Sequence, residues 1–268
     1  MIQKFLSVFL VLMACFFSLS AQTFYVSSPI NSLYIPGGSS IYKVTVTSTG
    51  LESIKLADCS PGDQYFSIAM NKKSLFWLKN SEIYSADVKD ESFENCKVLF
   101  PSMAYSNALT LGPDEKLYYS GSFLFATDIN TGKTDILGSL NYSSSGDMCF
   151  YNNELYMASN GGIVKINRQE PHKSVMHIPL PAYTIFGIVS VSTSLRKNTV
   201  YGLASINQNR TDVLEFDMEN KKVLRVVGSL PYGVLDAAST VENGSILGIE
   251  VEKIDINQDC NAGDKAII

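Results

Sequence analysis

The stretch Leu117–Leu140, LYYSGSFLFATDINTGKTDILGSL, shows the pattern that decides the fold. It contains three runs rich in β-branched and aromatic residues, separated by a Ser-Gly-Ser turn at 120–122 and a polar turn at 128–133. Such runs, bounded by Gly, Asn and Asp, are typical of short strands joined by hairpins. The stretch therefore predicts three consecutive strands, over 117–119, 123–127 and 134–140.

The same unit recurs along most of the chain. A pair of apolar and aromatic residues begins at positions 33, 75, 117, 155 and 200, and a weaker pair without the aromatic begins at 246, at intervals of 42, 42, 38, 45 and 46 residues. A second apolar pair follows 7 or 8 residues later in the first four units and 13 residues later in the fifth, and a single isoleucine follows 8 residues later in the sixth. Two markers that keep the same offset indicate an internal repeat. In the fifth unit we expect the extra residues to lengthen the loop at 204–211.

Each repeat carries signals for four strands. Further apolar runs precede each marker pair from the second unit onward, at 66–70, 108–111, 148–151, 186–192 and 234–238. Closing strands are expected at 53–56, 97–100, 134–140, 174–180 and 222–230. A period near forty with four strands per unit predicts an all-β fold, a β-propeller of four-stranded antiparallel blades. Stacking around a ring buries both faces of each blade, which one sheet cannot do alone.

We predict one propeller domain over 22–268, with about six blades, and leave the number open between five and seven. In this arrangement, residues 24–27 pair into the blade built by the other end of the chain and complete the sixth blade. The alternative is that the propeller is incomplete here and belongs to a longer chain that continues beyond Ile268.

Residues 1–21 have the layout of a secretory signal peptide: Lys4, an apolar run over 5–17 and small residues near the cleavage point. The run is shorter than the roughly 20 apolar residues that a spanning helix needs. We therefore expect no transmembrane segment and an exported protein, located in the periplasm, at the cell surface or outside the cell.

Charge and cysteine content narrow the classes of partner. Removing residues 1–21 takes away one lysine and no acid, so the mature net charge is 20 − 26 = −6, and there is no basic patch. A nucleic-acid partner is not expected. Four cysteines remain, Cys59, Cys96, Cys149 and Cys260. An even number in an exported chain allows two disulfides in three connectivities, and buried thiols are the alternative.

The repeats resemble the broad superfamily of YVTN/NHL-like bacterial β-propellers. The resemblance rests on the LYYSGSFLFATDINTGK order in the stretch above and on LYMASNGGIVKINRQ at 155–169. The ending SLSAQ of the signal region and the Tyr-, Asn- and Ser-rich composition resemble exported proteins of the Bacteroidetes. These motifs cover most of the chain but are generic. The resemblance implies the fold, and it implies little about function because propellers bind, scaffold and catalyse.

Motifs that carry chemistry are weak. The two histidines, His172 and His177, lie around one predicted closing strand, at 174–180 on the rim, so we expect no catalytic triad there. Asp128 begins a D-x-N-x-G pattern that also opens calcium loops, but the twelfth position is Ser139, which favours a hairpin. The acidic segment 255–263 lacks the glycine and glutamate of such a loop. We therefore expect no cofactor, with calcium as the only alternative.

Three carboxylates and three tyrosines are candidate binding residues. Asp63, Asp147 and Asp236 lie on segments that enter innermost strands, where propeller enzymes hold metals at the channel mouth. Because Gly62-Asp63 and Gly146-Asp147 also fit turns, we favour a turn interpretation and assign no metal ligand or catalytic residue. Loops before the innermost strands also hold three tyrosines that could stack on a sugar or peptide: Tyr105, Tyr183 and Tyr232.

The sequence thus favours a non-catalytic exported module that binds or scaffolds a protein, peptide or glycan, as a monomer or as part of a larger multidomain chain. The alternative is a metal-dependent hydrolase or lyase with a cation bound by the three carboxylates. A divalent cation prefers such oxygen ligands. The ligand itself cannot be read from these motifs.

Overall fold

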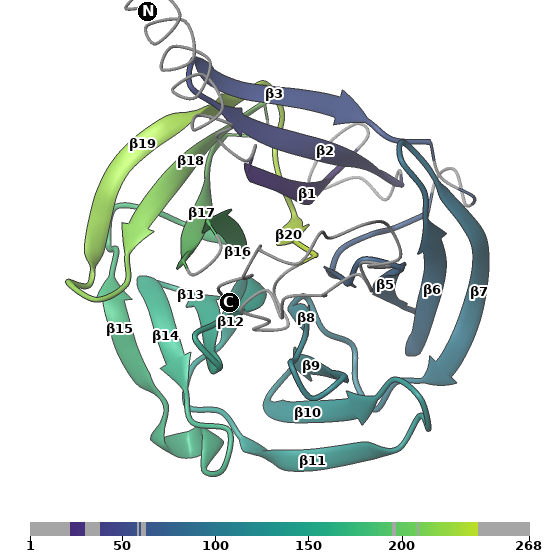
Figure 1. The fold of residues 1–268 in the computed structure, drawn as a ribbon. Coiled ribbons are helices and arrows are strands. Elements are labelled where there is room, and N and C mark those ends of the chain that lie inside the picture. Colours follow the sequence, from purple (N-terminus) through teal and green to yellow (C-terminus); the bar gives the residue numbers. More distant parts are fainter. Residues whose placement is uncertain are drawn as a thin grey trace, which may run out of the picture.

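The computed structural model describes residues 22–29, 38–57, 59, 63–194, 197–207 and 209–240. These residues form five four-stranded antiparallel sheets arranged as blades around a ring (Figure 1). The predicted β-propeller fold is therefore confirmed. The predicted signal segment 1–21, the marker pairs at 33–34 and 246–247, Cys260 and the acidic segment 255–263 lie outside the described residues.

In four blades the strands follow one another in the chain, from the innermost strand to the outermost. Blades 2 and 3 contain β4 (Ile68–Met70), β5 (Ser74–Lys79), β6 (Glu82–Val88), β7 (Phe93–Pro101), β8 (Leu109–Leu111), β9 (Lys116–Ser120), β10 (Phe123–Asp128) and β11 (Thr134–Ser139). Blades 4 and 5 contain β12 (Ser144–Tyr151), β13 (Glu154–Ser159), β14 (Gly162–Ile166), β15 (Val175–Pro179), β16 (Ile185–Ser194), β17 (Lys197–Asn207), β18 (Arg210–Asp217) and β19 (Lys222–Leu230). A short 3-10 helix, η2 (Pro171–Lys173), precedes β15.

Blade 1 is built from both ends of the described chain. Its innermost strand is β20 (Asp236–Ala238), which pairs with β1 (Gln22–Pro29), followed by β2 (Ser39–Thr47) and β3 (Gly50–Lys55). Within the β1–β20 pair, Tyr25 lies opposite Ala238. The ring is thus closed by strands from the two ends of the chain, as the sequence predicted.

The structure describes five blades, one fewer than the expected value of about six and within the range of five to seven. Residues 234–238 were expected to open a sixth blade, but β20 instead supplies the missing innermost strand of blade 1, so the described ring has five blades. Residues 24–27 form part of the second strand of this blade. The expected long loop at 204–211 is also wrong, because its residues extend β17 and β18 into a longer hairpin.

Burial explains why these segments form strands of different character. The inner strands β4, β8 and β20 are buried along their whole length, whereas in the outermost strand β7 only Phe93 is buried and the other residues are partly or fully exposed. Neighbouring blades cover both faces of an inner strand, so its residues read as a continuous apolar run. Outer strands are edge strands, with only part of their surface covered.

Among the described residues, the core consists of five apolar clusters, one at each interface between neighbouring blades. Trp77 in β5 illustrates the packing. It is fully buried between Tyr65 and Tyr84, with ring centroids 5.2 and 5.3 Å away. The interface between blades 5 and 1 is as apolar as the others, which gives the five-bladed ring a continuous core.

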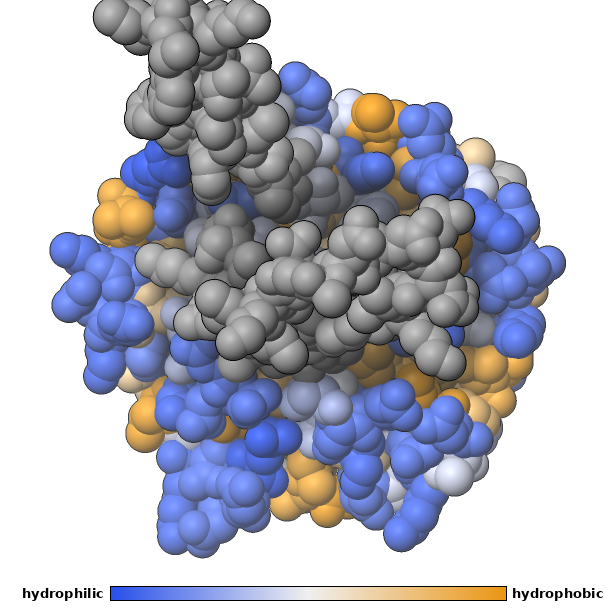
Figure 2. All heavy atoms as spheres, in the orientation of Figure 1, coloured by the Kyte–Doolittle hydropathy of each residue, from blue (hydrophilic) through white to orange (hydrophobic). Residues whose placement is uncertain are grey.

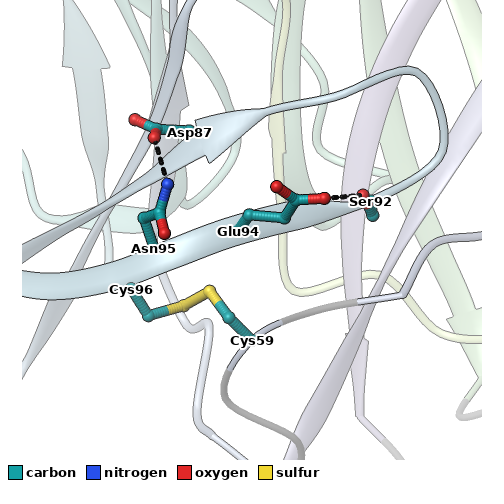
Figure 3. Close-up of a disulfide and its surroundings, with 6 residues drawn as sticks. All are labelled: Cys59, Asp87, Ser92, Glu94, Asn95 and Cys96. Atoms are coloured by element: carbon teal, nitrogen blue, oxygen red, sulfur yellow. Dashed lines mark hydrogen bonds between the residues drawn. A yellow bond between two sulfur atoms is a disulfide. The ribbon is translucent and has the colours of Figure 1, made fainter.

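A disulfide ties the link between blades 1 and 2 to the outside of blade 2 (Figure 3). It joins Cys59 to Cys96 in β7 across 37 residues of sequence, with a Cα–Cα distance of 5.7 Å. The pairing of β6 with β7 shifts register next to Cys96, where Asn95 adopts a left-handed φ of 56° and donates from Nδ2 to Asp87 Oδ2 at 2.7 Å. Such a bulge re-aims a neighbouring side chain. Here it directs Cys96 toward Cys59. A third cysteine, Cys149, is fully buried in β12.

None of the helices in the part of the chain that the structure describes is long and apolar enough to cross a membrane.

Candidate functional site

Asp147 and Asp236 occupy the same position of the repeat. The residues that follow them, Met148 and Ala237, pair with equivalent positions of the second strands of blades 4 and 1. By the same registers, the position of the two aspartates is taken in the other three blades by Ser67, Ala108 and Gly187. Two of the five blades therefore place a carboxyl group at one level beside the axis of the ring.

Backbone N–H groups from four blades converge on these two carboxyl groups. Asp147 accepts hydrogen bonds from Met148 N at 2.6 Å, Ile188 N at 2.8 Å and Ala237 N at 3.2 Å. Asp236 accepts from Ile68 N at 2.5 Å and from Ala237 N at 2.9 Å. All four donors stand at the position that follows the aspartate position. The pair therefore binds β12, β16, β20 and β4 together where the innermost strands meet.

The protonation of the pair follows from its burial. Both carboxyl groups are fully buried and hydrogen-bond to each other. Burial raises the pKa of Asp147 to about 8, although its hydrogen bonds act in the opposite direction. Burial and the neighbouring Asp147 carboxylate raise the pKa of Asp236 well above its usual value. Because two like charges in contact in a buried site cannot both ionise cheaply, the pair holds a shared proton at neutral pH.

The surroundings of Asp147 correct the turn interpretation of Gly146-Asp147, because both residues lie inside β12. A Cβ at Gly146 would collide with the backbone of Phe186, just before the position of Gly187 in β16. Ser145 Oγ, in β12, donates to Ile185 O, in β16, at 2.6 Å. The glycine is therefore needed for the close approach of β12 to β16, which brings Asp147 within reach of Ile188 N.

Asp63 is held by different partners. Its carboxylate forms an ion pair with Lys79 and accepts a hydrogen bond from Gln64 N at 3.0 Å. Its carbonyl oxygen accepts from Ser39 N at 2.7 Å, which joins the link before β4 to blade 1. The carboxyl group is buried, and Lys79 offsets its charge. Asp63 thus stabilises the junction of blades 1 and 2.

The three carboxylates do not form a metal centre of the kind that the hydrolase alternative requires. Within the described ranges, no group of three or more His, Cys, Asp or Glu side chains is placed to hold a metal ion. Asp147 and Asp236 accept five backbone hydrogen bonds between them, so their oxygens face protein donors. The arrangement can clamp strands and hold a proton, but it offers a substrate no exposed carboxylate.

The three candidate tyrosines differ in exposure. Tyr105, between β7 and β8, is 67% exposed. Tyr183, before β16, packs against the apolar cluster between blades 4 and 5. Tyr232, before β20, stacks on Tyr42 with a centroid distance of 4.4 Å, and burial raises its pKa to about 12. Only Tyr105 of these three presents a largely free ring.

Two sequence-based interpretations of local motifs agree with the structure. Asp128 caps the β10–β11 hairpin, because its Oδ1 accepts from Asn130 N at 2.9 Å and from Thr131 N at 2.8 Å, and Gly132 adopts a φ of 71°. His177 lies in the outermost strand β15, where its Nε2 lies 2.8 Å from Met218 O. Burial lowers the pKa of His177.

Comparison with known proteins does not assign the chain to a family. No protein-family model and no curated protein matches the chain. Among solved structures, the chain is similar to a protein of unknown function from Bacteroides thetaiotaomicron. The match covers 83% of this chain and 72% of that protein, with 10% identity and a TM-score of 0.54. A structure from work on the de novo evolutionary emergence of a symmetrical protein covers 82% of this chain and 98% of its own, with 13% identity and a TM-score of 0.51. The likeness shows the fold alone.

Proposed function

We propose that this chain is an exported, non-catalytic β-propeller that binds a protein, peptide or glycan in the periplasm, at the cell surface or outside the cell. We also propose that it is related to the YVTN/NHL-like propellers, on the sequence motifs of its repeats. The fold alone does not select among functions, so the proposal rests on the surface that the fold presents.

Export is supported by the Cys59–Cys96 disulfide. Disulfides persist in oxidising compartments and are rare in the reducing cytosol. The signal peptide at 1–21 stays a prediction and is the second reason for this part of the proposal.

The observation that carries the binding function is a group of exposed apolar side chains on blade 3. Tyr105 and Met103, in the β7–β8 loop, are 67% and 60% exposed, and Phe123, at the start of β10, is 46% exposed. We call these three residues the blade-3 patch. Aromatic residues at such positions supply contact area at a low entropic cost, which favours recognition of a ligand.

The two segments of the patch support each other. A Cβ at Gly121 in the β9–β10 turn would lie 3.5 Å from Tyr105 O, so the turn lies against the loop. Ser106 Oγ donates to Ser120 O at 2.6 Å, and the Tyr119 hydroxyl accepts from Met103 N at 3.2 Å. These bonds order the loop around Tyr105, which lowers the entropy lost when a ligand binds.

The test is a screen of the oxidised mature protein, residues 22–268, on glycan and peptide arrays. For a ligand found in the screen, Tyr105→Ala should weaken binding about tenfold, or about 1.4 kcal/mol, as expected for an aromatic anchor. The matched control is Ile136→Ala in β11, which changes a residue that is 59% exposed and should leave the affinity unchanged.

Three results would contradict the proposal. The first is a screen that finds no ligand, and the second is a ligand whose affinity is unchanged by Tyr105→Ala. The third is turnover of a ligand that one substitution abolishes, which would restore the enzyme alternative. Both residues are exposed, so both variants should fold. Thermal melting of each variant checks this.

A further inference from the structure

Blade 4 contains a polar cavity on the face of the ring opposite to the face that carries the blade-3 patch. The patch lies on an inter-blade loop and on the turn between second and third strands, whereas the cavity lies beside the β12–β13 and β14–β15 connections. In an up-and-down blade these two sets of connections lie at opposite ends. The cavity has a volume of about 500 Å³, within the range of small-molecule sites. Its polar lining includes Asn153, Glu154, Lys165, Arg168, Gln169 and Lys173.

The lining carries more positive than negative charge. Three of these side chains are cations and one is a carboxylate. Lys165 pairs with Glu154 at 3.1 Å, and Lys173 pairs with Glu170 at 2.6 Å. Arg168 has no carboxylate within 4.0 Å in the described part of the chain, whereas Arg210 and Arg225, the other arginines described there, both pair with one. The cavity thus holds a guanidinium whose charge no ion pair offsets.

Arg168 is fixed in position although it forms no ion pair. Its guanidinium lies 5.3 Å from the ring centroid of Phe150 and 5.8 Å from that of Tyr118. Its terminal nitrogens donate to Asn153 O at 3.2 Å and to the Tyr118 hydroxyl at 3.4 Å. These two bonds use two of its five N–H donors, and the others remain for a ligand. A planar guanidinium with donors to spare suits a carboxylate, which it can bind with two parallel hydrogen bonds.

We propose that this cavity binds an acidic saccharide, with the sugar carboxylate on Arg168 and the sugar hydroxyls on the side-chain amides of Asn153 and Gln169. Amides both donate and accept, as hydroxyl groups require. Lys165 and Lys173 are paired with Glu154 and Glu170, so the uncompensated positive charge that faces the carboxylate is that of Arg168. The site does not depend on the blade-3 patch, so either site can fail in experiment without the other.

The experiment is calorimetric titration of the oxidised mature protein with D-galacturonate, D-galactose and inorganic phosphate. Galacturonate should bind at least tenfold more tightly than galactose, which has the same hydroxyl pattern at its ring without the carboxylate, and more tightly than phosphate. Arg168→Gln should weaken galacturonate binding at least tenfold. Arg225→Gln is the matched control and should bind as the wild type does.

Arg168→Lys separates recognition from packing. Lysine keeps a cation near Tyr118 and Phe150 but lacks the planar pair of donors, so the melting temperature should hold while galacturonate affinity falls at least fivefold. If Arg168→Gln does not fold, Lys173→Gln takes its place and should weaken binding about threefold. Equal affinity for galacturonate and galactose, preference for phosphate, or unchanged affinity in Arg168→Lys would each overturn the proposal, and so would the absence of galacturonate binding.

Discussion

The axis and the rim of this propeller differ in which side chains they bury. At the axis, two carboxyl groups are fully buried and accept hydrogen bonds from four blades. At the rim, the outermost strands leave large apolar side chains in water, such as Val98, Ile136 and Leu224, which are 48%, 59% and 54% exposed. Figure 2 shows the result on the face in view, where separate apolar patches interrupt a largely polar perimeter.

The difference separates structural residues from candidates for recognition. The two aspartates at the axis have protein partners, so they act on the stability of the ring. The apolar residues at the rim lie on edge strands, and the pairing to the outermost strand shifts register in blades 2, 3, 4 and 5. Bulges of this kind make an edge a poor template for another strand. Exposure at the rim is thus tolerated, and recognition is left to the loops.

The largest effect is expected at the axis, for Asp147→Ala. It removes three hydrogen-bond acceptor contacts and leaves Asp236 buried without its partner, which should cost about 3–5 kcal/mol of unfolding free energy. Urea denaturation followed by fluorescence measures the loss. Glu94→Ala, which removes an exposed carboxylate shown in Figure 3, is the control and should change stability by less than about 0.5 kcal/mol. A loss below about 1 kcal/mol for Asp147→Ala would show that the axis is no more sensitive than the rim.

A smaller effect is expected from pH. The pKa values of Asp147 and Asp236 are raised in the folded state, so between about pH 4 and about pH 8 the folded chain holds a proton that the unfolded chain has released. Stability should therefore fall as pH rises through this window, by up to about 1.4 kcal/mol per pH unit for one proton. Asp128 and Asp217, whose pKa values are lowered, lose their contribution only below this window.

Denaturation at several pH values measures that slope. Asp147→Asn should flatten it, because this variant removes the carboxyl group whose pKa is raised to about 8 and also the charge and hydrogen bond of Asp147 that help to raise the pKa of Asp236. The infrared band of a protonated carboxyl group at neutral pH gives an independent measurement on the unmodified protein. A slope equal in both proteins, together with no such band, would contradict the shared proton.

The smallest effect is expected at the rim, for Ile136→Thr in β11. The side chain is 59% exposed and threonine keeps the β-branched shape that strands favour, so stability should change by less than about 0.5 kcal/mol. Thermal melting of this variant and of Asp147→Ala under the same conditions compares the loss of stability at the rim with the loss at the axis. A drop larger than about 1 kcal/mol would mean that the rim is packed against something in solution.

The strands could be predicted from sequence because each has a local signal. The outermost strand β19 was predicted over the residues that it occupies, and the marker at 117–119 lies within β9. The number of blades could not be predicted in this way, because it depends on which strand β1 meets. Packing between blades 5 and 1 decides that pairing, and its cluster includes residues about 200 positions apart, such as Val26 and Ala237, which pair in blade 1.

The site was less predictable than the fold. The aspartates were found because they precede inner strands, but their contact with each other depends on the geometry of the ring. Lys79 as the partner of Asp63 has no signal in the spacing of the chain. Arg168 has none either, because its environment is made by Tyr118 in the neighbouring blade. Of the three tyrosines expected in loops, Tyr183 and Tyr232 pack inward, and only Tyr105 is largely exposed.

The shared construction of blade 1 also sets the order in which the protein can be completed during synthesis. β1 ends at Pro29 and β20 begins at Asp236, so 206 residues must be added before the two strands can meet. At a ribosomal rate of about 5–20 residues per second, that interval is roughly 10–40 s. Blades 2, 3, 4 and 5 have all their strands before then, while β1 still lacks its inner neighbour. Closure is thus a late event, and a chain that crosses a membrane during synthesis would complete its ring on the far side.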